Sequence, residues 1–177
     1  MRICAIIFAI TCMISNWVSV SMLPPPIEVP TVMQVYDSLS EDQKDELPVE
    51  VKARVAGMKV DEYKFISSVV EAESDRKKNN ESFENRVHIT IVILNRVDSK
   101  KFPNSIKKVL KQRGQFSVVT SGAYKRVGRT KLSDRAVIEA VKRKKSGSCP
   151  NILYFRAGHF FRGHRRYKKI GDNCFSY

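Results

Sequence analysis

The sequence predicts a mainly helical domain of the α+β class, with a small β or irregular element near its C-terminal end. Three observations support this. Apolar residues recur at helical spacing in several runs between residues 40 and 145, and capping residues or glycines stand at the ends of those runs. The tail 152–177 is instead aromatic, basic and interrupted by glycines, which is typical of short strands or loops. A length of 177 residues fits one such domain and a targeting segment.

Residues 1–21 are predicted to be a signal peptide or an N-terminal anchor. Arg2 precedes an apolar run, and Ser19 and Ser21 are small residues two apart, as at a cleavage site. Two alternatives stay open: the interrupted apolar run could anchor the chain in a membrane, or Cys12 could carry a lipid. We therefore expect an exported protein, located in the periplasm, in the cell wall or outside the cell.

Residues 22–59 are predicted to be a proline-containing acidic linker with short helices. Ser40 and Gln43 have the spacing of a capping box. A second short helix is expected from Pro48 to Ala56, because Gly57 can end it. This acidic section could lie on the basic domain and mask its charge, or it could be a solvated helical linker.

Residues 60–177 are predicted to contain four helices before the tail. The second helix is rich in β-branched residues, so periodicity alone leaves a strand open, but its length favours a buried helix. The last helix ends in a cationic turn, as the negative end of a helix dipole prefers. The residues expected to cap or begin these helices are Asp61, Glu84, Pro103 and Ser133.

The net charge of +14 is unevenly distributed. Residues 22–62 hold nine acidic and four basic residues, so the positive charge is concentrated in residues 63–177. A module this basic is expected to bind a polyanion. For an exported protein the candidates are the cell envelope, anionic wall polymers or a membrane surface, and export argues against nucleic acid.

The cysteines predict one disulfide. Cys4 and Cys12 belong to the targeting segment, which leaves Cys149 and Cys174 as an even pair in an exported domain. A disulfide between these two is the favoured interpretation, and two buried free thiols are the alternative. Neither cysteine has the spacing of a zinc site, and neither a metal nor another cofactor is implied.

A set of motifs follows a fixed order along the chain. An apolar helical run that begins at Tyr63 ends near Glu71, and a second apolar run begins at Val87, 24 positions after the start of the first. The motifs, in order, are Leu94-Asn95-Arg96-Val97, Phe102-Pro103-Asn104, Gln115-Phe116-Ser117, Leu153-Tyr154-Phe155 and Ile170-Gly171-Asp172. The set resembles the catalytic domain of the SleB-type cell wall hydrolases, the family of spore-cortex-lytic enzymes. The resemblance covers about residues 60–177, and it implies a lysozyme-like helical domain that acts on peptidoglycan.

The resemblance also implies that Glu71, which closes the first helix, is the catalytic acid. A glycosidic oxygen needs a proton as it leaves, and an apolar pocket keeps a carboxyl protonated. The sequence departs from the family after Ala72, where Glu73 and Ser74 replace the usual Arg-Gly. Soluble lytic transglycosylases end this helix with Glu-Ser, so Glu73 is the alternative. Residues two apart on a helix point roughly 200° away from each other, so only one can face the cleft.

A single acid suits a lytic transglycosylase, in which the 6-hydroxyl of the muramic acid attacks and leaves a 1,6-anhydro product. Hydrolysis by water, as in a muramidase, stays open. The bond expected to break is the β-1,4 link between N-acetylmuramic acid and N-acetylglucosamine. Gln115, Phe116 and Tyr154 are the candidates for sugar binding, with core packing as the alternative for each.

A function of another class is also compatible with the sequence. Basic and aromatic residues alternate along 159–169, a pattern that can bind a wall polymer, a membrane surface or a nucleic acid. A non-catalytic cationic protein that binds the envelope or nucleic acid is therefore the rival to the enzyme. Within the enzyme class, wall remodelling, spore germination and lysis by a phage endolysin are equally compatible with the sequence, and nothing in it indicates an oligomeric state.

Overall fold

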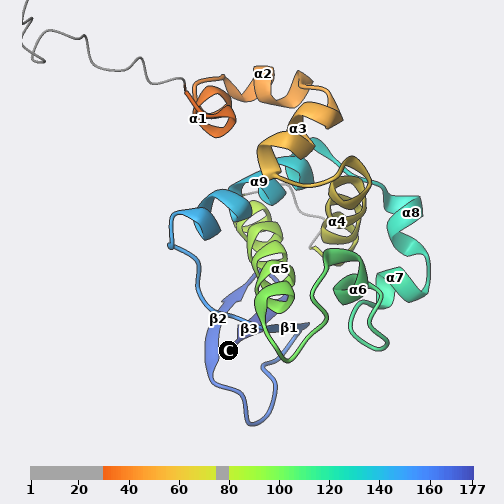
Figure 1. Cartoon of the computed structure of the whole chain (residues 1–177). Coiled ribbons are helices and arrows are strands. Elements are labelled where there is room, and N and C mark those ends of the chain that lie inside the picture. Colours follow the sequence, from red (N-terminus) through yellow and green to blue (C-terminus); the bar gives the residue numbers. More distant parts are fainter. Residues whose placement is uncertain (1–29, 75–79) are drawn as a thin grey trace, which may run out of the picture. The chain divides into compact units, whose positions relative to one another are not determined.

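The computed structural model describes residues 30–74 and 80–177 (Figure 1). Residues 31–177 form one compact unit, which contains every helix and strand of the described residues. The predicted signal peptide lies outside the described residues and stays a prediction. In the described part of the chain, no helix is both long and apolar enough to cross a membrane.

The unit consists of helices followed by a small sheet, which confirms the predicted fold class. In the described residues every helix precedes the strands, and the strands form a three-stranded antiparallel sheet of order β1-β3-β2. The elements are α1 (Val32–Asp37), α2 (Glu41–Glu46), α3 (Val49–Ala56), α4 (Val60–Glu73), α5 (Asn80–Asp98), α6 (Ile106–Leu110), α7 (Ser117–Thr120), α8 (Ala123–Val127), α9 (Lys131–Lys145), β1 (Tyr154–Ala157), β2 (Arg166–Ile170) and β3 (Asn173–Ser176).

Helix α5 forms the centre of the core. It packs against α4, α6 and α9 and against the sheet, and from residue 85 to residue 96 its side chains are buried on every side. A helix buried on every side lies in a protein interior, and the polar side chains of α5 are hydrogen-bonded there. This burial explains why the run contains so many β-branched residues, and it confirms the predicted helix over the alternative strand.

Polar contacts attach the sheet to α5. The Asn85 amide donates to the carbonyl oxygen of Ile170 at 2.6 Å, and the Asn173 amide donates to Asn85 Oδ1 at 3.1 Å. On the same side of α5, the His88 ring stacks on Tyr167 and tilts against Phe175. The central strand β3 is buried along its whole length, so the sheet is held against the core rather than standing free.

Four predicted helix starts need correction. Helix α5 begins at Asn80, four residues before the expected Glu84. The N-cap residue of α4 is Lys59, and Asp61 lies in the first turn. Helix α6 begins after Ser105, whose hydroxyl accepts from the helix backbone, so Pro103 precedes it. Helix α9 is capped by Thr130, whose side chain bonds the third residue of the helix in a capping box. The predicted cap Ser133 is that third residue.

The acidic segment packs on the basic domain. Figure 1 shows α1, α2 and α3 beside α9. Tyr36 and Val55 are buried in the shared core, and Lys52 approaches the buried Asp134 at 3.6 Å. The predicted domain boundary at residue 59 therefore lies inside one compact unit, and these helices are not a solvated linker. Ion pairs between this segment and α9 are Asp37–Lys142, Glu41–Arg135, Asp45–Arg135 and Glu46–Lys131.

The structure does not form the predicted disulfide. Cys149 and Cys174 are both free thiols. Cys149 follows α9, where its thiol contacts the carbonyl oxygen of Ala140 at 3.8 Å. Cys174 is buried in β3, opposite Arg156 of β1 and Lys169 of β2. Each cysteine thus has its own surroundings, and the alternative of two free thiols holds.

Candidate active site

Glu71 lies at the meeting point of three elements. Its carboxylate accepts two hydrogen bonds from the Arg86 guanidinium of α5, from Nε to Oε2 and from Nη2 to Oε1, each 2.8 Å long. The hydroxyl of Thr130, the N-cap of α9, donates to Oε2 at 2.8 Å. A bidentate, charge-assisted pair of this kind is among the strongest hydrogen-bonded contacts in proteins. Glu71 therefore joins α4 to α5 and to the start of α9.

Arg86 is enclosed by this arrangement. It is 2% exposed, and Glu71 is 9% exposed. The Nη1 atom of Arg86 donates to the carbonyl oxygen of Ser82 at 3.0 Å and also contacts the Ser82 hydroxyl. A buried guanidinium is costly unless it has a charged partner and satisfied donors. The arrangement at Glu71 supplies both, so these residues form a buried structural ion pair.

Glu73, two residues further along α4, has a different environment. Its carboxyl is largely buried, and burial raises its pKa above the ordinary value for a glutamate. A hydrogen bond to the backbone of Val118, in α7, acts in the opposite direction with a smaller effect. Its Oε1 atom is buried and has no hydrogen-bond partner among the described residues. As helical spacing predicts, the two glutamates face different neighbours.

This environment is the one that a general acid requires. A carboxyl can donate a proton only if it still holds one near the working pH, and desolvation favours the protonated form. The Glu73 carboxyl lies beside α7, which directly follows the Gln115-Phe116-Ser117 motif. The motif and the end of α4 are thus brought together.

The three residues predicted to bind sugar differ in how far they are exposed to solvent. Gln115 is exposed and stays a candidate. Phe116 is 1% exposed and packs against Phe155 and the Arg96 guanidinium, so it cannot stack on a sugar ring in this structure, and that prediction is wrong. Tyr154 is half-buried and stays a candidate, in edge contact with Phe102 and with His164.

Two residues of this region were missed in the sequence. Arg86 directly precedes the apolar run that begins at Val87, and an arginine next to a buried run indicates a partner of opposite charge. That signal could have identified the Glu71 ion pair. Val118 bonds Glu73 through its backbone. Any residue can make a backbone contact, so the residue type gives no signal of it. Among the described residues, no group of His, Cys, Asp and Glu side chains could hold a metal ion.

Comparison with known proteins identifies the family. A family model described as Cell Wall Hydrolase matches residues 80–176. The chain belongs to the cell wall hydrolase family. Peptidoglycan is therefore its class of substrate. The match begins after the end of α4, so it leaves the choice between Glu71 and Glu73 open.

Two solved structures resemble the chain. One is the catalytic domain of the Bacillus cereus SleB protein, with 25% sequence identity and a TM-score of 0.56, covering 67% of this chain and 91% of that one. The other is the catalytic domain of a germination-specific lytic transglycosylase, SleB from Bacillus anthracis, with 26% identity and a TM-score of 0.55, covering 68% and 98%. These likenesses confirm the resemblance to SleB-type hydrolases. No curated protein matches the sequence significantly.

Proposed function

We propose that this cell wall hydrolase cleaves the glycan strand of peptidoglycan between N-acetylmuramic acid and N-acetylglucosamine, with Glu73 as its single acid. The observation that carries the proposal is the state of the Glu73 carboxyl, which belongs to a half-buried residue, has a raised pKa and has one oxygen without a partner among the described residues. The raised pKa favours the protonated form that a general acid needs.

Glu71 was the first choice from the sequence, and its contacts argue against it as the acid. A guanidinium can only donate hydrogen bonds, so the bidentate contact with Arg86 suits an ionised carboxylate and not a carboxylic acid. The Thr130 hydroxyl adds a third donor to the same group. In this proposal Glu71 holds the end of α4 in place, and Glu73 performs the chemistry.

The mechanism follows from one acid. Glu73 protonates the glycosidic oxygen as the bond to the muramic acid carbon breaks, and positive charge develops on the sugar ring. The 6-hydroxyl of the same muramic acid then attacks that carbon. Its proton passes to the Glu73 carboxylate, which restores the acid and closes a 1,6-anhydro ring.

Two observations favour this route over attack by water. Most glycosidases need a second carboxylate as a base or a nucleophile. The nearest carboxylate along the helix is Glu71, which Arg86 and Thr130 already bind. One of the two similar structures is also described as a lytic transglycosylase.

The predicted signal peptide at residues 1–21 is the means by which the domain would reach the wall.

The test is digestion of purified peptidoglycan by the full chain, with the soluble products weighed by mass spectrometry. Products that end in 1,6-anhydromuramic acid are expected. Products with reducing ends, heavier by one water, would instead show that water attacks. If folded protein releases no soluble product from walls of several compositions, the chain is a cationic wall-binding protein and the enzyme proposal fails.

A further inference from the structure

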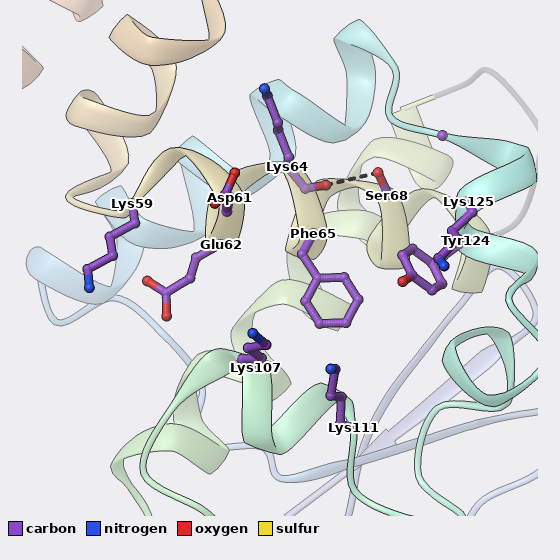
Figure 2. A pocket seen from close by; sticks show the side chains of 11 residues that line it. Lys59, Asp61, Glu62, Lys64, Phe65, Ser68, Lys107, Lys111, Tyr124 and Lys125 are labelled. Carbon is purple, nitrogen blue, oxygen red and sulfur yellow. Dashed lines mark hydrogen bonds between the residues drawn. The ribbon is translucent and has the colours of Figure 1, made fainter.

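An open cavity lies along the first half of α4. It has a volume of about 720 Å³ and is lined by residues from α4, α6 and α8 and from the positions next to these helices (Figure 2). Its α4 residues lie between Lys59 and Ser68, so it is separate from Glu71 and Glu73 at the end of that helix. Ser68 precedes Glu73 by five residues, which is about 7.5 Å along a helix axis. One extended ligand could therefore reach both places.

The cavity is strongly basic. Five lysines line it, against two acidic residues at the start of α4, Asp61 and Glu62. Within residues 30–74 and 80–177, none of these five lysines forms an ion pair. Lysines of α9 do, as with Lys131 to Glu46 and Lys142 to Asp37. The lysines of the cavity are Lys59, Lys64, Lys107, Lys111 and Lys125.

An aromatic surface lies among these charges. Figure 2 shows the Phe65 ring pointing from α4 toward Lys107 of α6 and Lys111, which follows that helix, with Tyr124 at its side. The Phe65 and Tyr124 ring centroids are 5.1 Å apart, and the planes are tilted by 58°. An aromatic side chain left half-exposed in a cavity offers an apolar face to a ligand. The cavity thus combines several cations, an apolar face and two carboxylates.

We propose that this cavity binds the peptide stem of the peptidoglycan strand that the enzyme cleaves, and the inference rests on the proposed function. A stem peptide carries free carboxylates, and its diamino acid carries an amine. The carboxylates match Lys107 and Lys111, and the amine matches Asp61 and Glu62, which also stabilise the positive end of the α4 dipole. The alanine methyl groups of the stem pack on the aromatic face.

The peptide stem then gives the enzyme a second contact with its substrate, away from the bond that is cleaved. Binding it on the same helix that carries Glu73 places the attached muramic acid near the acid. Contacts away from the reacting bond can be used to orient that bond. A strand whose stems have been removed is therefore expected to bind more weakly than an intact one.

The experiment measures binding without turnover. The probe is the disaccharide N-acetylglucosaminyl-N-acetylmuramic acid with its peptide, which lacks the bond that the enzyme is proposed to cleave. Its affinity for the full chain is measured by calorimetry, beside the same disaccharide without the peptide. Replacing Lys107 and Lys111 by glutamine is expected to weaken binding of the peptide form about tenfold and to leave the bare disaccharide unaffected.

A matched control is available in the same part of the chain. Lys101 and Lys108 are exposed and do not line the cavity, and Lys108 belongs to α6 itself. The Lys101→Gln/Lys108→Gln variant loses the same charge and should bind like the wild type. Equal affinity of the two double variants for the peptide form would overturn the proposal.

A third probe separates the stem from another polyanion. If the Lys107→Gln/Lys111→Gln variant loses affinity only for a phosphate-linked wall polymer, the cavity is a phosphate site and the stem proposal is wrong. These measurements need no cleavage, so their failure is distinct from the failure of the proposed activity. Anhydro products from the wild type together with unchanged stem binding in the variant would reject the cavity alone.

Discussion

The two sides of the last turn of α4 place the same residue type in opposite environments. On the side toward α5 and α9, Glu71 is bound by Arg86 and Thr130. On the side toward α7, Glu73 has a raised pKa and an oxygen without a partner among the described residues. A buried carboxylate with every partner in place stabilises a fold. A buried carboxyl without them costs stability and is held ready for chemistry.

The difference teaches that burial alone does not mark a catalytic acid. Glu71 is buried and Glu73 is half-buried, so burial alone would not select Glu73. The partners distinguish them, because a guanidinium stabilises the charged form while an apolar surrounding stabilises the neutral one. Exchanging or removing those partners is therefore the most direct way to test the assignment.

The largest expected effect is the loss of activity in Glu73→Gln. The variant keeps the shape of the side chain but cannot give a proton, so the rate of wall digestion should fall about 10²–10⁴-fold. Its melting temperature should not fall, because the variant removes a poorly solvated carboxyl. The rate is measured as the clearing of a peptidoglycan suspension, with Glu50→Gln, an exposed glutamate of α3, as the control. A Glu73→Gln enzyme as fast as this control would reject the assignment.

The next effect is on stability. Glu71→Gln leaves the Arg86 guanidinium buried without its charged partner, which should lower the free energy of unfolding by about 3–5 kcal/mol. Urea denaturation measures the change. The double variant Glu71→Met/Arg86→Met should lose less than Glu71→Gln alone, because it leaves no buried charge unpaired. A stable but inactive Glu71→Gln protein would instead make Glu71 the acid.

Most of the fold followed from local signals in the sequence. The helix over α5 was predictable because the run is longer than a typical strand, although its periodicity does not exclude one. Gly57 ended α3 as expected, and its positive φ of 67° is the left-handed conformation that favours glycine. The cap of α9 was missed because Thr130 and Ser133 are both good capping residues three apart. Local propensity does not decide between them.

The candidate site was predictable only in part. The motifs located the acid at the end of α4. The choice between Glu71 and Glu73 depends on which of them faces Arg86, and Arg86 lies 15 residues after Glu71 in the sequence. The predicted disulfide failed for a similar reason, since two cysteines in one domain need not lie together. Phe116 resembles a sugar-stacking residue in sequence, and its burial is a property of the assembled core.

A smaller effect on stability is expected at Thr130. Thr130→Val removes both the hydrogen bond to Glu71 and the N-cap of α9, which together should cost about 1–2 kcal/mol. Thr130→Ser keeps the hydroxyl and should be close to the wild type. The same denaturation measurement compares them. Equal loss in both variants would mean that the methyl group matters and the hydrogen bonds do not.

The smallest expected effect is on the pH dependence of activity, which distinguishes a proton on Glu73 from one on Glu71. Because burial raises the pKa of Glu73, its protonated form persists to a higher pH than that of an exposed glutamate. Activity that depends on this proton is full below the raised pKa and is lost as the pH rises through it. The value of kcat/KM, measured against pH on soluble glycan strands, should therefore fall on the alkaline side at a pH above the ordinary range for a glutamate. Weakening the Glu71–Arg86 pair with Thr130→Val should leave that fall in place, since the proton belongs to the other side of the helix. A falling limb that moves with Thr130→Val would tie the working proton to Glu71.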